Sequence, residues 1–122
     1  MIYKIGMLCK HFKGSNLIEK NIYRIEKLDV NGIDVDENTI TYTGDNNLKK
    51  ATNLVIYSNI FQDNKLFCRE YEDISQELSE DKKVMFNQTL KVQPLTVDEE
   101  KQIQSNEYIE TKKEYILKKY SN

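Results

Sequence analysis

The most apolar run of the chain is Asn53-Leu54-Val55-Ile56-Tyr57-Ser58-Asn59-Ile60-Phe61. It has the length of a strand and is rich in β-branched and aromatic residues, which is typical of a buried central strand. Residues 62–65 are turn formers, and apolar residues return in residues 66–71. The spacing therefore predicts a β-hairpin made of residues 53–61 and 66–71.

Alternating apolar and polar side chains predict further strands on both sides of this hairpin. Four segments fit a period of two: residues 1–13, 21–30, 39–43 and 84–92. In the last of them four apolar residues share one face: Val84, Phe86, Leu90 and Val92. Turn-forming clusters separate the segments, at residues 14–16, 31–32 and 44–47. Pro94 should end the last strand, because proline cannot donate a ladder hydrogen bond.

Two segments favour helix. Residues 72–83 are polar except for Ile74 and Leu78, whose spacing fits a helical turn or two packed through these side chains. Residues 96–99, Thr-Val-Asp-Glu, form a capping box that predicts a helix over residues 97–119. Its apolar stripe is thin, so three arrangements stay open: packing along the sheet, which we favour, self-association, or fraying.

At 122 residues the chain has the size of a small globular domain. These segments predict a mostly β fold, a small SH3-like antiparallel barrel of five to six strands, with a C-terminal α-helix. The barrel would span residues 1–95, and residues 96–122 would be a helical extension.

Composition and charge exclude some classes of protein. The formal net charge of −2 gives no general attraction to nucleic acid or anionic lipid, which disfavours single-stranded nucleic-acid binding. No apolar run approaches the ~18 residues of a membrane span. The N-terminus also lacks the apolar core of a secretory leader. We expect a cytoplasmic protein in which Cys9 and Cys68 are reduced thiols.

The candidates for catalysis and metal binding are few. Three zinc ligands could come from Cys9, His11 and Cys68, but no fourth ligand is apparent. For a nucleophilic thiol, the arrangement that stays open is Cys68 beside His11 across the sheet. Residues 34–38 alternate oxygen-bearing side chains as a calcium loop does, but Thr39 and Asp45 replace the glycine and glutamate that the loop requires. We predict no cofactor and no enzymatic activity.

Four short motifs resemble a known family: Lys10-His11-Phe12-Lys13-Gly14, Tyr23-Arg24-Ile25, Leu54-Val55-Ile56-Tyr57 and Phe67-Cys68-Arg69. Over residues 5–95 the chain resembles the bacterial and phage domain family of unknown function numbered 1653, which carries a His-Phe-Lys-Gly signature. The chain departs from that family by a longer insert after Leu28, by Glu70 in place of proline, and by a tail after Pro94. The resemblance implies a compact, mostly β domain of the small-barrel kind with no established activity.

The residues themselves favour an anion-binding site. Arginine offers a planar fork suited to phosphate, histidine and lysine add donors, and tyrosine faces can stack a nucleobase. Seven residues near predicted strand ends form the candidate site: Lys10, His11, Lys13, Arg24, Tyr57, Arg69 and Tyr71.

We therefore predict a non-catalytic domain that captures a small anionic, nucleotide-like ligand. One version is a phage sponge that sequesters a nucleotide immune signal. The alternative is a protein–protein interaction module that binds a host protein through the barrel edge or the C-terminal helix, and that helix could also form a homo-oligomer.

Overall fold

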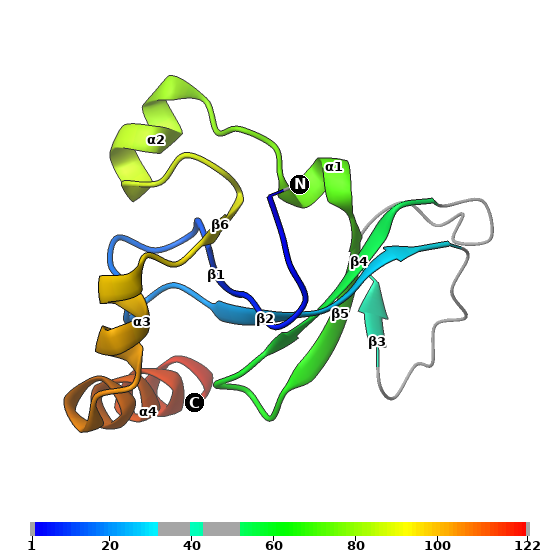
Figure 1. The fold of residues 1–122 in the computed structure, drawn as a ribbon. Coiled ribbons are helices and arrows are strands. Elements are labelled where there is room, and N and C mark those ends of the chain that lie inside the picture. Colours follow the sequence, from blue (N-terminus) through cyan, green and yellow to red (C-terminus); the bar gives the residue numbers. More distant parts are fainter. Residues whose placement is uncertain (1, 32–39, 43–51, 122) are drawn as a thin grey trace.

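The computed structural model describes residues 2–31, 40–42 and 52–121 (Figure 1). The predicted turns at Gly32 and residues 44–47, and the calcium-like loop at residues 34–45, lie wholly or largely outside this part of the chain.

The predicted hairpin is confirmed. It consists of β4 (Leu54–Asn59), in which every residue is buried, and β5 (Lys65–Glu70), and the two strands pair antiparallel from Leu54 opposite Glu70 to Asn59 opposite Lys65. Asp63 and Asn64 both have positive φ, and the Lys65 N–H bonds the Gln62 carbonyl. Two consecutive positive φ values are typical of the tight turns whose twist matches a hairpin.

The sheet contains six strands and is open. The other four are β1 (Leu8–His11), β2 (Ile22–Val30), β3 (Ile40–Tyr42) and β6 (Val92–Pro94). Their order is β3-β5-β4-β2-β1-β6; β3 runs parallel to β5, and the other neighbours are antiparallel. The fold is therefore β-rich with C-terminal helices, but the sheet does not close into the predicted barrel. The edge strands have three residues each, and they lie at opposite ends of the order.

The edge at β6 is protected against further pairing. The buried Tyr3 hydroxyl lies 2.6 Å from the Val92 carbonyl oxygen and 2.9 Å from the Ile74 carbonyl oxygen, so its one proton serves both acceptors. Pro94, the last residue of the strand, has no N–H to offer. An additional strand would find few free groups along this edge.

Two predicted strands differ from the structure. The segment 1–13 contributes only Leu8–His11, because Gly6 at φ 86° turns the chain where the Met7 N–H bonds the Lys4 carbonyl. The predicted strand at residues 84–92 is wrong over most of its length, because residues 84–86 belong to helix α2 (Glu80–Phe86) and β6 begins only at Val92. Ser79 caps α2 by accepting the Lys82 N–H, and Val84 is 84% exposed.

The helical predictions are confirmed in part. Helix α1 (Tyr71–Ile74) is the expected single turn, and Ile74 and Leu78 are buried. The capping box is present at helix α3 (Val97–Ile103), where Thr96 accepts the Glu99 N–H and Glu99 accepts the Thr96 N–H. The predicted single helix is two, because Ser105 caps a second helix, α4 (Asn106–Tyr120).

Helix α4 is bound to the connection between β1 and β2. The Tyr108 hydroxyl donates to the Leu17 carbonyl at 2.8 Å. The Lys112 ammonium donates to the Ile18 and Lys20 carbonyls at 2.6 Å each, and this residue is only 2% exposed. The predicted apolar stripe of the helix is thin, and the hydrogen bonds of these two side chains supplement it.

The two faces of the sheet are covered differently (Figure 1). We call one the α1 face, since Ile74 of α1 packs there with Tyr3, Val55 and Tyr57. We call the other the α4 face, since Tyr108 of α4 packs there with Ile22 and Ile103. In the described part of the chain no helix is long and apolar enough to cross a membrane.

Candidate functional site

Aromatic rings gather on the α1 face over β2, β4 and β5. The centroids of Tyr23 and Tyr57 are 4.7 Å apart, and Phe67 stacks on Tyr57 at 5.7 Å with an interplanar angle of 18°. These rings share one face because Ile25 pairs with Tyr57 and Tyr57 with Phe67 across the strands, while Tyr23 lies two residues before Ile25. The tyrosines are buried, whereas Phe67 is partly exposed.

His11 lies at the border of this aromatic cluster. Its ring centroid is 4.8 Å from that of Phe12 and 6.3 Å from that of Tyr23, and its Nδ1 accepts the Lys13 N–H at 3.4 Å. Burial, together with the positive charges of Lys13, Arg69, Lys91 and Lys20, lowers the pKa of His11 to about 4. The charges that shift this imidazole are therefore all cationic.

An ion-pair bridge lies near the same face. Arg69 pairs across the sheet with Val55, which places its side chain on the α1 face. Asp73, one helical turn later, binds the Arg69 guanidinium with one carboxylate oxygen and accepts Lys91 Nζ at 3.1 Å with the other. Burial alone would raise the pKa of Asp73, but the Lys91 hydrogen bond and the Arg69 charge outweigh it and lower this pKa.

We define the aromatic–cationic surface as these seven residues together: His11, Tyr23, Tyr57, Phe67, Arg69, Asp73 and Lys91. The side chains of the ion-pair bridge remain in contact with solvent, at 28% exposure for Arg69, 29% for Asp73 and 32% for Lys91. Lys91 also lines a hollow of about 230 Å³ with Lys82, whose ammonium lies 5.8 Å from the Phe12 ring centroid. The surface thus offers accessible cationic donors beside aromatic rings.

The seven residues predicted from the sequence do not all meet. His11, Tyr57 and Arg69 lie on the α1 face, and Tyr71 is on the same side, where its hydroxyl accepts the Ile2 N–H.

The other three are not members of this group. Lys13 follows the end of β1 and is exposed, although its N–H binds His11 Nδ1 and its charge acts on His11. Lys10 and Arg24 project to the α4 face, because each is next in sequence to a residue of the α1 face, Cys9 and Tyr23 respectively.

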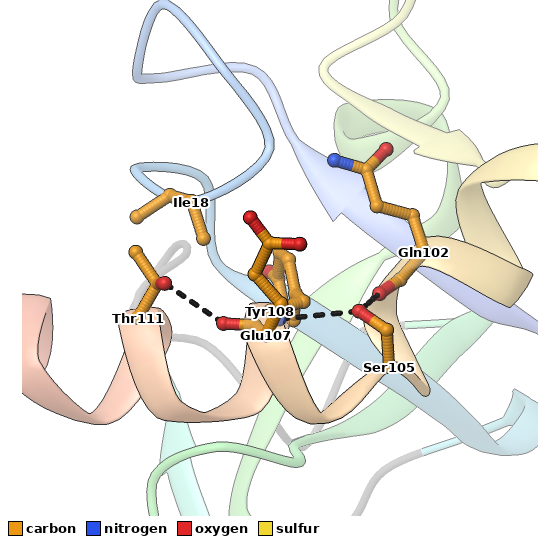
Figure 2. A pocket seen from close by; sticks show the side chains of 6 residues that line it. All are labelled: Ile18, Gln102, Ser105, Glu107, Tyr108 and Thr111. Carbon is orange, nitrogen blue, oxygen red and sulfur yellow. Dashed lines mark hydrogen bonds between the residues drawn. The ribbon is translucent and has the colours of Figure 1, made fainter.

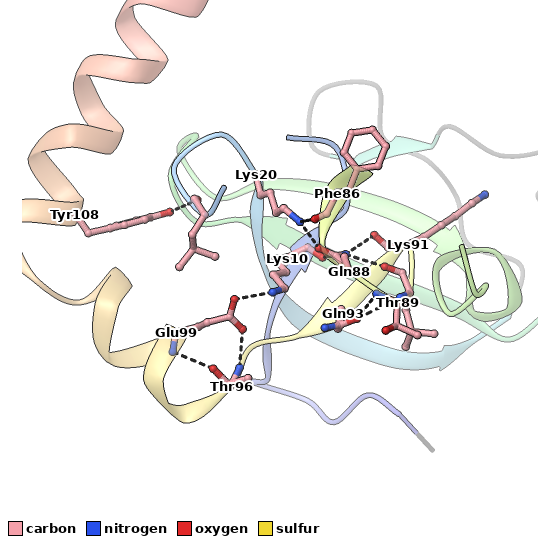
Figure 3. Close-up of polar contacts among 12 residues, drawn as sticks. Lys10, Lys20, Phe86, Gln88, Thr89, Lys91, Gln93, Thr96, Glu99 and Tyr108 are labelled. Carbon is pink, nitrogen blue, oxygen red and sulfur yellow. Dashed lines mark hydrogen bonds and ion pairs between the residues drawn. The ribbon is translucent and has the colours of Figure 1, made fainter. Parts of the chain in front are cut away.

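Lys10 has a structural partner on the α4 face. Its ammonium binds Glu99 of α3 at 2.6 Å, and the same Glu99 closes the capping box with Thr96 (Figure 3). Nearby, Gln88 accepts Lys20 Nζ at 2.9 Å and donates to the Lys10 carbonyl at 3.1 Å. These buried groups bind one another, so we assign Lys10 to the attachment of α3 rather than to a ligand site.

Four members of the surface were not among the seven residues predicted from the sequence: Tyr23, Phe67, Asp73 and Lys91. The sequence does contain a signal for Asp73. It lies four positions after Arg69, and this spacing brings the two side chains together when a helix begins at Tyr71. Lys91 gave no such signal. It lies just before β6, where its N–H bonds the Gln76 carbonyl in the segment after α1, and from there its ammonium binds Asp73.

The cysteines do not support the metal or thiol arrangements considered from the sequence. Cys9 lies on the α1 face and Cys68 on the α4 face, both buried and unbonded to each other, so Cys68 is separated from His11 by the sheet. Burial raises the pKa of the Cys9 thiol to about 12. Among the described residues no three or more His, Cys, Asp or Glu side chains are placed to hold a metal ion.

A second hollow, of about 230 Å³, lies between α4 and Ile18 (Figure 2). Its polar groups already bind within the helices. Ser105 donates to the Gln102 carbonyl and accepts the Tyr108 N–H, and Thr111 donates to the Glu107 carbonyl. We regard this hollow as a weaker candidate than the aromatic–cationic surface.

Comparison with protein-family models, curated proteins and solved structures finds no match to this chain. The resemblance to the family numbered 1653 stays a prediction, and the function is therefore argued from the aromatic–cationic surface itself.

Proposed function

We propose that the protein is a non-catalytic binding domain that captures a small anionic, nucleotide-like ligand on the aromatic–cationic surface. The observation that carries this proposal is the position of His11, beside an aromatic cluster and within the positive field of cations from separate parts of the chain. A positive field in a partly buried setting attracts phosphate, and it is screened less than one at an open surface.

The members of the surface have complementary roles in this proposal. Arg69 and Lys91 supply charged donors to phosphate oxygens. Phe67 is the partly exposed ring on which a base would stack, while Tyr23 and Tyr57 support it from below in the core. From the site predicted from the sequence, the aromatic–cationic surface keeps His11, Tyr57 and Arg69, and it adds Tyr23, Phe67, Asp73 and Lys91.

A thermal-shift screen of mono-, di- and cyclic nucleotides tests the proposal. A ligand that binds only the folded state raises stability by RT ln(1 + [L]/Kd), about 2.7 kcal/mol at one hundred times Kd. His11→Ala and Lys91→Ala should each reduce the shift. Arg24→Ala is the matched control, because Arg24 is exposed on the opposite face. Absence of any shift, or equal loss in the control, would contradict the proposal, and a response confined to cyclic nucleotides would favour the immune-signal version.

A protein-binding function is the second candidate, and exposed apolar residues on α4 favour it. Leu117 is 68% exposed and Tyr120 is 60% exposed, next to a shallow hollow of about 320 Å³ lined in part by Phe61 and Ile116. Leu117→Glu would abolish self-association or partner binding through this face and leave any nucleotide shift intact. Sedimentation analysis over a range of concentrations measures the self-association.

A further inference from the structure

Asp73 occupies the position that a ligand anion would need. Both of its carboxylate oxygens are engaged, one by Arg69 and the other by Lys91. These are two of the cations whose charges reach His11. The proposed binding surface therefore already contains one anionic group, supplied by the chain itself.

We propose that Asp73 is a built-in competitor that an incoming phosphate group displaces from Arg69 and Lys91. This inference rests on the proposed function and deepens it, since it concerns how the same surface is regulated. The ligand class it selects is a phosphate monoester carrying two negative charges, because such a group replaces the single charge of a carboxylate with more charge and a further acceptor oxygen.

The surroundings of Asp73 permit this exchange. All three side chains of the bridge keep about a third of their surface in solvent, so a ligand can reach them without opening the core. Helix α1, which carries Asp73, has only four residues, and Glu70 before it makes no side-chain cap hydrogen bond. A single weakly capped turn can move its side chain more readily than a strand within the sheet.

Charge favours the exchange as well. Arg69 presents a planar fork that matches two phosphate oxygens, and Lys91 acts as a point charge beside it. With Asp73 in place the two cations still exceed the carboxylate by one positive charge, and this remaining attraction is twice as large for a dianion as for a monoanion.

The test compares Asp73→Asn with the unmodified chain, using inorganic phosphate and a nucleoside 5′-monophosphate as probes. The chain has a single histidine, so the NMR signal of His11 reports binding at the surface directly. We expect Asp73→Asn to bind both probes about tenfold more tightly. Glu110→Gln is the control, because it removes the same charge from an exposed ion pair with Lys113 on helix α4, away from the α1 face, and should leave affinity unchanged.

The outcomes separate this inference from the proposed function. Equal or weaker binding by Asp73→Asn, with binding by the unmodified chain intact, overturns the competitor role alone. Binding by neither protein overturns both proposals. Asp73→Ser serves as a second neutral variant if the asparagine variant is poorly folded, because serine suits the first turn of a helix. Binding by the variants but not by the unmodified chain supports the competitor role and overturns ligand capture by the native protein.

Discussion

Lys112→Met tests how helix α4 is attached. The Lys112 ammonium is buried and donates to the Ile18 and Lys20 carbonyls at 2.6 Å, with the Phe61 ring centroid 5.9 Å away. Methionine has a side chain of similar length but leaves both carbonyls without this donor, at a cost of about 1–3 kcal/mol each. The substitution also removes the buried charge of the Lys112 ammonium, and this offsets part of the lost stability. We therefore expect a net loss of about 1 kcal/mol at pH 7.

The loss should grow with pH. Burial, together with the charge of Lys119, lowers the pKa of Lys112 to about 8. The unfolded chain keeps the ordinary, higher lysine pKa, so between these two values the unfolded state binds more protons and folding gains stability as pH rises. At 1.36 kcal/mol per pH unit, the interval from pH 8 to 9.5 adds about 2 kcal/mol to the stability of the native protein relative to the variant.

Urea unfolding at pH 7.0 and 9.5 measures this difference. Other titrating groups, such as Cys9, are present in both proteins and cancel in the comparison. Lys113→Met is the control, because the Lys113 side chain is 64% exposed and its ammonium lies 3.8 Å from the Glu110 carboxylate, so the substitution should change stability by less than about 0.5 kcal/mol. If the difference in the free energy of unfolding between the native protein and Lys112→Met stays constant or becomes smaller at pH 9.5, the reasoning is refuted.

Three further predictions follow from other parts of the fold. His11 should stay neutral until near pH 4 in an NMR titration, and a midpoint near 6.5 would contradict its placement. Because the unfolded chain keeps the ordinary histidine pKa of about 6.5, the protein should lose stability through His11 as pH falls from about 6.5 to 4. Tyr3→Phe should lose about 1–2 kcal/mol in urea, because the Ile74 and Val92 carbonyls lose their shared donor. Gly14→Ala should lose about 1–3 kcal/mol, because φ is 117° and the added Cβ would lie 2.9 Å from Glu19 Cβ; a melting temperature equal to that of the native protein would argue against this turn.

Local patterns predicted the parts of the fold that local chemistry determines. The hairpin at residues 53–71 and the capping box at Thr96 depend on residues a few positions apart, and both are present. The segment at residues 84–92 failed because its period of two competes with the cap that Ser79 provides for α2. The open sheet could not be foreseen, because strand order depends on contacts between distant segments such as β3 and β5.

In the candidate site, too, local sequence determines some features and contacts between distant segments determine others. Lys10 and His11 are adjacent in one strand and must point to opposite faces, so the strand period alone could have removed Lys10 from the predicted site. The burial of Lys112 could not be predicted from its type, since lysine is mostly exposed unless it is paired. Its partners are backbone carbonyls more than ninety residues away, and a backbone carbonyl gives no sequence signal of such a contact.

The attachment of α4 has a consequence for synthesis of the protein on the ribosome. Leu17, Ile18 and Lys20 are translated more than ninety residues before Tyr108 and Lys112, the residues that bind their carbonyls. The nascent chain can form the central hairpin while it is still tethered, yet the connection between β1 and β2 acquires its partners only when helix α4 has left the exit tunnel. Ribosome stalling before α4 emerges would therefore leave this connection open to protease, although its own residues are already synthesised.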